Sequence, residues 1–459
     1  MPLFIQGLMK SLSGCSPEAR FFLEVVSGRA SRGDHADGAF RVKPLARQLC
    51  IPEGDVSSAF AELVSADVIE RLASAPSGKG RPTVSYQFSP PTLMALEAQP
   101  QSYGLHSAHL ERLFSGADIP TEIPGKQPKI QKERASVTKN QKPAPPGARS
   151  RLSICNRLLL GMLLANADQF GVVKALTSKD LRLLTGFDAE SLKRRLQRLV
   201  GVGLIRSCVP GVTSSIFRAR RVNSTYFLNL NHPGFGVTGD CAVMVHVVSE
   251  SKAETDAVDV LWRDILAART VSPVSPSETP IEVIHLLANE RRSVIDVLRL
   301  IIYQCASELL SRHWVDLARE GPVHYEWLSE RIEAVLQCSS DPNLGDVSAD
   351  LEWRAVISHF CNLVVRVASV YRARFEVANG VGFSSAGFSI LPVSYDERER
   401  CIAMLLHPRP KELSACTVLR DGGRDGVAPK SWGSEAEMPL SYRFQFGLVT
   451  PPAKRLLRG

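Results

Sequence analysis

The chain has 459 residues, of which 44% are hydrophobic and 22% are charged, and its formal net charge at pH 7 is +8. This length predicts about two to four domains, and the composition excludes a disordered or fibrous chain. No apolar run approaches the roughly 18 residues that a membrane-spanning helix needs, and residues 1–10 lack the pattern of a secretory signal peptide. The ten cysteines stand singly, which argues against a zinc ribbon and favours a reducing cytoplasm.

The positive charge is concentrated in the middle of the sequence. Residues 16–90 hold nine basic and nine acidic residues, whereas residues 126–150 hold seven basic and one acidic, and residues 151–231 hold 13 basic and four acidic. The remainder from residue 232 onward is net acidic. A local basic block of this kind is the electrostatic footprint expected of a protein that binds the phosphates of nucleic acid.

The first predicted domain, residues 16–90, opens with Ser16-Pro17-Glu18. Serine is a favoured N-cap and proline is favoured at the first helical position, so we expect a helix to begin here. The later elements are expected to be a strand at 40–42, a helix at 44–50, a turn at 52–55 followed by a helix, and strands at 68–73 and 83–88. Lys79 and Arg81 lie between the last two strands, in a basic hairpin tip.

Residues 91–150 are predicted to connect the first domain to a second one. The part from 92 to 114 has a helical pattern, and the part from about 120 is predicted to be a disordered basic linker because it is rich in Pro, Lys, Gln and Ser. His106 and His109 are three residues apart in this connector, but no third ligand is nearby. We therefore expect two surface histidines and no metal site.

The second predicted domain, residues 151–231, has the same order of elements. They are expected to be a helix at 152–166, a strand at 172–176, a helix capped by Thr177 or Ser178, a turn at 186–188, a helix at 189–200, and strands at 204–209 and 225–230. Three arginines lie between the last two strands: Arg218, Arg220 and Arg221.

The two domains repeat one apolar pattern at a spacing of 136 residues. The positions Leu45, Ile51, Val56, Phe60, Leu63, Val68 and Ile69 recur as Leu181, Phe187, Leu192, Leu196, Leu199, Leu204 and Ile205. Each copy resembles the winged helix-turn-helix family of DNA-binding domains. The matching stretches run from Leu45 through Asp67-Val68-Ile69 and from Leu181 through Gly203-Leu204-Ile205. The two domains that contain them cover about a third of the chain. The resemblance implies that the second helix of each motif lies in a major groove and that the hairpin, or wing, contacts the backbone or minor groove.

Charge distinguishes the two copies. Leu192, Leu196 and Leu199 are placed inward in the second copy. The outward arc of its second helix then carries Glu190, Arg194, Gln197 and Arg198. Lys193 and Arg195 lie on the flanks of this arc. The same construction in the first copy places Gly54, Ser58, Ala61 and Glu62 outward, and none of these residues is a cation. Arginine can pair with guanine and glutamine with adenine, so the second copy is predicted to be the main DNA reader.

The C-terminal half contains no chemical motif of an enzyme. Residues 240–379 have wide apolar helical stripes and are predicted to be an oligomerisation or effector domain, and residues 380–459 form a tail rich in Gly and Pro whose fold is not predicted. There is no GxSxG, P-loop or HExxH sequence. We expect no enzymatic activity, no cofactor and no metal.

The expected fold is mainly α with small β wings: two winged helix-turn-helix domains and a helical C-terminal domain. The leading hypothesis is a cytoplasmic, nucleoid-associated regulator of transcription that binds double-stranded DNA as a homodimer, chiefly through the second copy. A possible protein partner would bind the first copy or the C-terminal helices, and no membrane association is expected. Two alternatives remain open, a replication initiator of a plasmid or mobile element and a protein-interaction adaptor.

Overall fold

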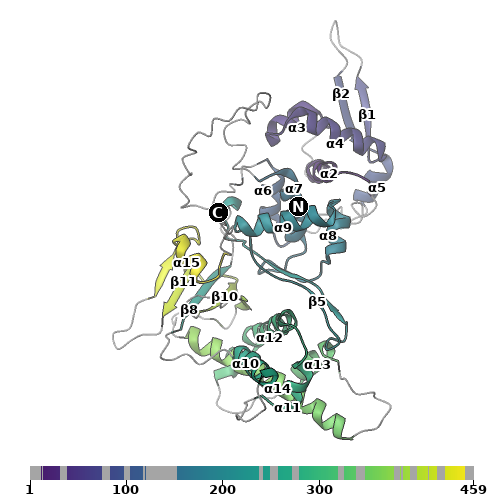
Figure 1. The fold of residues 1–459 in the computed structure, drawn as a ribbon. Coiled ribbons are helices and arrows are strands. Elements are labelled where there is room, and N and C mark those ends of the chain that lie inside the picture. The colour runs from purple at the N-terminus through teal and green to yellow at the C-terminus, as the bar shows by residue number, and fades with distance from the viewer. Residues whose placement is uncertain are drawn as a thin grey trace, which may run out of the picture. The chain divides into compact units, whose positions relative to one another are not determined.

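The computed structural model describes residues 12, 14–30, 39–74, 83–97, 104–116, 119, 152–236, 241–248, 257–270, 279–318, 325–337, 347–376, 383, 386–392, 401–411, 413–420 and 429–449. The fold mixes helices and sheets, with helices predominant (Figure 1). The described residues form two compact units, one within 1–205 and 228–237, the other within 206–227 and 238–450. No described helix has the length and apolar character to cross a membrane. The predicted linker from about residue 120 lies outside the described residues, as do Lys79 and Arg81.

The first copy contains four helices and a hairpin. Their bounds are α2 (Pro17–Ala30), α3 (Val42–Leu49), α4 (Glu53–Ser65), β1 (Ile69–Ser74), β2 (Thr83–Phe88) and α5 (Pro90–Glu97). As the Ser-Pro start predicts, Ser16 Oγ accepts a hydrogen bond of 3.2 Å from the N–H of Ala19 in the first turn of α2. The strand predicted at 40–42 is reduced to one bridge between Phe40 and Tyr86, because Val42 already belongs to α3.

The second copy follows the helix α6 (Ser107–Phe114). Its elements are α7 (Ile154–Ala165), β3 (Val172–Val173), α8 (Ser178–Thr185), α9 (Ala189–Gly201), β4 (Ile205–Val209), β5 (Val212–Thr213), β6 (Arg221–Val222) and β7 (Thr225–Leu228), followed by the 3-10 helix η1 (Pro233–Phe235). Thr177 caps α8 in a capping box with Asp180. The boundary between the two units falls within β4 and β7, so residues 206–227 belong to the second unit.

The helices of the two copies correspond at the spacing that the sequence predicts. Both α8 and α9 begin and end 136 residues after α3 and α4. The left-handed backbone positions also recur, because Cys50 and Asp67 have φ values of 55° and 57° where the second copy has Gly186 and Gly203 at 76° and 79°. Glycine adopts this conformation without strain, so the second copy has the less strained turns.

The two copies pack together within the first unit through the equivalent helices α2 and α7 (Figure 1). Every residue from Phe21 to Gly28 in α2 and from Cys155 to Leu164 in α7 is buried. A helix that is buried on every face must be enclosed on all sides, and each of these helices is enclosed by its own copy and by the other. In the view of Figure 1, α3 and α4 lie on one side of α2 and α7, and α8 and α9 on the other.

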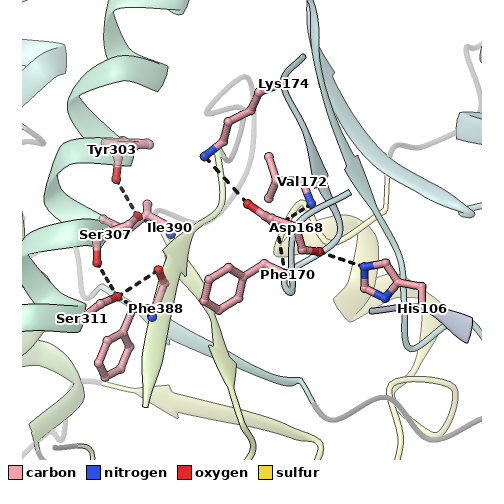
Figure 2. A network of polar contacts seen from close by, with 10 residues as sticks. All are labelled: His106, Asp168, Phe170, Val172, Lys174, Tyr303, Ser307, Ser311, Phe388 and Ile390. Atoms are coloured by element: carbon pink, nitrogen blue, oxygen red, sulfur yellow. Dashed lines mark hydrogen bonds and ion pairs between the residues drawn. The ribbon is translucent and has the colours of Figure 1, made fainter. Parts of the chain in front are cut away.

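The expectation that His106 and His109 lie on the surface is wrong. Both are buried, because α6 packs against α7 and η1 in the first unit. His106 Nε2 lies 2.9 Å from the carbonyl oxygen of Asp168, and His109 Nε2 lies 3.0 Å from that of Leu230. Figure 2 shows His106 against the turn that Asp168 closes, where Asp168 Oδ1 accepts from the N–H groups of Phe170 and Val172.

The second unit combines a group of helices with a five-stranded sheet. The helices are α10 (Ala257–Thr270), α11 (Ile281–Leu287), α12 (Arg292–His313), η3 (Asp316–Ala318), α13 (Glu326–Val335), α14 (Val347–Glu376) and α15 (Leu440–Gln445). The strands are β8 (Ala242–Val247), β9 (Gly387–Ile390), β10 (Cys401–His407), β11 (Cys416–Arg420) and β12 (Lys430–Trp432), in the order β12-β11-β8-β10-β9. Only the pair β8 and β11 is parallel.

The sheet joins two regions that the sequence pattern separates. Strand β8 lies in the region predicted to be helical, and the other four strands of the sheet lie in the tail whose fold is not predicted. All six residues of β8 are buried, and a short continuous apolar run of this kind is typical of a central strand covered on both faces. The tail is therefore part of the second unit rather than an appendage.

The outer edge of β9 is covered by hydroxyl groups of α12. Ser307 Oγ accepts a hydrogen bond of 2.9 Å from the N–H of Ile390, and Ser311 Oγ accepts one of 2.8 Å from the N–H of Phe388 (Figure 2). The same hydroxyls donate to the carbonyl oxygens of Tyr303 and Ser307, one turn earlier in α12. The exposed hydrogen-bonding groups of an edge strand can recruit other chains, and α12 removes this hazard at β9.

Candidate nucleic-acid interface

One face of α9 carries four side chains that no hydrogen bond or ion pair joins to the rest of the described chain. All four are exposed: Lys193, Arg194, Gln197 and Arg198. Their spacing of three and four residues places them on one side of the helix. On the opposite side Leu192 and Leu199 are buried, as the apolar pattern predicts, whereas Leu196 is only half-buried.

The start of α9 is fixed by local hydrogen bonds. The N-cap residue Asp188 accepts hydrogen bonds of 2.8 Å from both the N–H and the hydroxyl of Ser191. These bonds lower the pKa of the Asp188 carboxyl, because they stabilise its charged form. The negative charge also lies at the positive end of the helix dipole. The cationic face therefore stands on a helix whose first residue is well defined.

Arg195 lies in a different environment from its predicted partners on α9. Its guanidinium stands 4.7 Å from the ring centroid of Phe187, and its Nη1 donates a hydrogen bond of 3.2 Å to Asn156 Oδ1 in α7. Arg195 is half-buried, and its side chain faces α7 and the turn before α9. In this structure it joins α9 to the protein core instead of extending into solvent.

Two further cations belong to the helix that packs against α9. Lys179 and Arg182 of α8 are exposed, and neither was among the predicted site residues. The helical pattern could have found them, because Leu181 and Leu184 are the buried positions of α8 and leave residues 179 and 182 outward. Glu190 is also exposed, and it is the one acidic side chain on the outward arc of α9.

The predicted wing arginines lie in the second unit. Arg218, Arg220 and Arg221 are exposed; Arg218 and Arg220 lie in the tip between β5 and β6, and Arg221 begins β6. The tip is anchored by the buried side chains of Ile216 and Phe217. It is also anchored by backbone hydrogen bonds to the end of α13: the N–H of Arg218 donates to the Val335 carbonyl at 2.9 Å, and that of Gln337 donates to the Ile216 carbonyl at 2.8 Å.

The corresponding helix of the first copy lacks a cationic face. The exposed residues on α4 are acidic or small: Glu53, Gly54, Asp55, Ser57, Ser58, Ala61 and Ser65. Glu62, predicted to point outward, is half-buried, and its Oε2 accepts a hydrogen bond of 2.7 Å from the N–H of Ser16 at the start of α2. Its carboxylate therefore supports α2.

The described residues contain no group of three or more His, Cys, Asp or Glu side chains that could hold a metal ion. The nine described cysteines are all free thiols. What the arrangement offers chemically is an array of hydrogen-bond donors and positive charges on α9 and α8. Comparisons of the chain with protein-family models, with curated proteins and with solved structures find no match.

Proposed function

We propose that the chain is a sequence-specific double-stranded-DNA-binding protein built on two tandem winged-helix motifs, the second of which reads the bases through α9. The observation that carries this proposal is the set of free, exposed donors on one face of α9: Lys193, Arg194, Gln197 and Arg198. Arginine can donate two hydrogen bonds to guanine and glutamine can pair with adenine, while lysine neutralises phosphate.

A run of charges on a helix is often no more than a solvated face. The repeat supplies an internal comparison, because α4 has the same length and apolar frame as α9 and exposes no cation. The charges on α9 are therefore not a requirement of this fold. The exposed Lys179 and Arg182 of α8 extend the same positive surface, which favours an anionic partner.

The proposed role of this binding is regulation of transcription, by a homodimer whose two-fold symmetry matches that of a two-fold DNA site. Genome-wide mapping of the bound intact protein tests the role. Sites upstream of several genes would support regulation, whereas occupancy of a single origin would favour a replication initiator instead.

The binding itself is tested with the purified full-length chain. Duplexes that it enriches from a random-sequence pool provide a selected sequence, and fluorescence anisotropy measures its affinity for that sequence and for a scrambled one. We expect Arg194→Ala with Arg198→Ala to weaken binding to the selected duplex by roughly 100-fold or more, since a bidentate base contact is worth about 1–3 kcal/mol.

The matched control is Arg41→Ala with Arg47→Ala, which removes the same charge from exposed positions at and within α3. This pair should change the affinity by less than about threefold. Equal losses from the two pairs would contradict the assignment to α9, because they would indicate a response to net charge alone.

A further inference from the structure

Arg20 of α2, in the first copy, reaches the end of α8 in the second. The side chain is buried, and its Nη1 donates hydrogen bonds to the carbonyl oxygens of Leu183, at 2.8 Å, and Leu184, at 3.2 Å. Its Nε donates to the Cys15 carbonyl at 3.2 Å, and its Nη2 donates to the Leu12 carbonyl. One guanidinium of the first copy thus binds carbonyl groups of the segment just before α2 and of the second copy.

These contacts lie where a helix most needs them. The last carbonyl groups of a helix have no intrahelical partner, and a cation near them also interacts favourably with the helix dipole. Leu183 and Leu184 belong to the final turn of α8, just before the turn that leads into α9. Arg20 therefore fixes the point at which the helix-turn-helix segment of the second copy changes direction.

The turn itself packs closely against Arg20. Gly186 has a φ of +76°, and a Cβ atom at this position would lie 2.9 Å from Arg20 Nε and 3.0 Å from the Cys15 carbonyl oxygen. Both the backbone conformation and the space therefore require glycine. The position of the turn before α9 is set against residues of the first copy.

A second contact joins α2 to α7, another helix of the second copy. The thiol of Cys155 in α7 donates a hydrogen bond of 2.8 Å to Glu18 Oε1 in α2. Burial, and then the hydrogen bond to Glu18, raise the pKa of this thiol to about 12, so it is a neutral donor. The adjacent Asn156 accepts the hydrogen bond from Arg195 of α9. Polar contacts therefore run from α2 through α7 to α9.

We infer that the first copy serves as an internal support for the DNA-reading helix of the second, and that Arg20 is the positioning residue which sets the turn between α8 and α9. The inference rests on the proposed function of α9. It also gives the electrically neutral first copy a role that needs no contact with DNA.

The test uses full-length Arg20→Lys and Arg20→Met, and compares affinity for the selected duplex with affinity for the scrambled one. Lysine keeps the charge, but its ammonium group lacks the planar fork with which arginine reaches four carbonyl groups. In both variants we expect the affinity for the selected duplex, divided by the affinity for the scrambled one, to fall at least about tenfold. The salt dependence of binding should stay that of the wild type, since the phosphate-binding cations of α9 are retained.

Circular dichroism identifies a temperature at which each variant is fully folded, and binding is measured at that temperature. Gly186→Ala provides an independent variant with the same expected loss of discrimination. Its control is Gly14→Ala, because Gly14 also has a positive φ (+96°) but no neighbour within 4 Å of an added Cβ. Gly14→Ala should leave the ratio unchanged.

Two results would overturn the inference. If the wild type prefers its selected duplex and the folded Arg20 and Gly186 variants keep that preference, the first copy does not position α9, and the proposed function stands. If the wild type itself shows no preference for any duplex, the proposed function and this inference both fail.

Discussion

Single side chains on α9 have different surroundings although their types are alike. Arg194 and Arg198 are exposed, whereas Arg195 stacks on Phe187 and donates to Asn156. A helical wheel places Arg195 on the flank of the cationic arc, which is why it was predicted to bind DNA. A flank position can face either solvent or a neighbouring helix, and only the packing of α7 against α9 determines which.

Glu24 in α2 is a buried carboxyl group whose Oε1 has no hydrogen-bond partner among the described residues. Burial raises the pKa of Glu24 to about 8 from a usual value of 4.5, because desolvation disfavours the charged form. The folded state therefore binds the proton more tightly than the unfolded state. Its contribution to stability is present at low pH and is lost as the pH rises from 4.5 to 8.

The variant Glu24→Leu should remove this dependence of stability on pH. Leucine is the chosen replacement because the equivalent residue of α7, Leu160, is a buried leucine. At pH 8 we expect the variant to be more stable than the wild type by an amount of the order of 4 kcal/mol, shrinking toward pH 5. Urea unfolding at pH 5, 6.5 and 8 measures the difference. A difference that does not change with pH would show that Glu24 does not titrate in this range.

At the scale of elements, a buried ion pair joins β4 to the segment before α15. Both Arg206 and Glu435 have almost fully buried side chains, 2% and 1% exposed, and they meet through two hydrogen bonds of 2.8 and 2.5 Å. Arg443 is buried in the same region, where burial lowers the pKa of its guanidinium and Glu435 raises it. Removal of the Glu435 carboxylate would leave the buried guanidinium groups of Arg206 and Arg443 without its compensating negative charge.

We therefore expect Glu435→Gln to reduce the free energy of unfolding by about 3–5 kcal/mol, the usual cost of breaking a buried pair. The double variant Arg206→Met with Glu435→Leu should lose much less, since it leaves no uncompensated charge on either partner. Urea denaturation of the full chain measures both. Additive losses in the double variant would mean that the two side chains do not stabilise each other.

The helices were predictable from sequence where an apolar period and a local start signal coincide. Thr177, which is followed by Asp180, and Ser16, which precedes a proline, both cap helices as expected. The strands of the tail were not predictable, because β10 and β11 pair with β8, more than 150 residues earlier in the chain. The contact from Arg20 to Leu183 is likewise set by tertiary packing that local patterns do not encode.

At the scale of the whole molecule, the helices of the two copies form one compact unit instead of two linked modules, while residues 206–227 of the second copy belong to the other unit. The cations predicted for the site are divided between the units, with those of α9 in the first and those of the hairpin, Arg218, Arg220 and Arg221, in the second. The sequence pattern predicts a wing with strands at 204–209 and 225–230, and it gives no indication that the segment between them attaches to another part of the protein. This attachment, to α13, depends on residues more than 100 positions away, so the sequence pattern of the copy alone could not indicate it.

The central claim is that α9 binds the phosphates and bases of duplex DNA, and the salt dependence of binding tests it most directly. For the wild type, a log–log plot of the affinity against salt concentration should have a slope of roughly −4 to −7, as for a protein with several phosphate contacts. Lys193→Ala with Arg198→Ala should reduce its magnitude by about 1–2, while Arg41→Ala with Arg47→Ala should leave it unchanged. A flat wild-type response, or equal changes from both pairs, would contradict the claim.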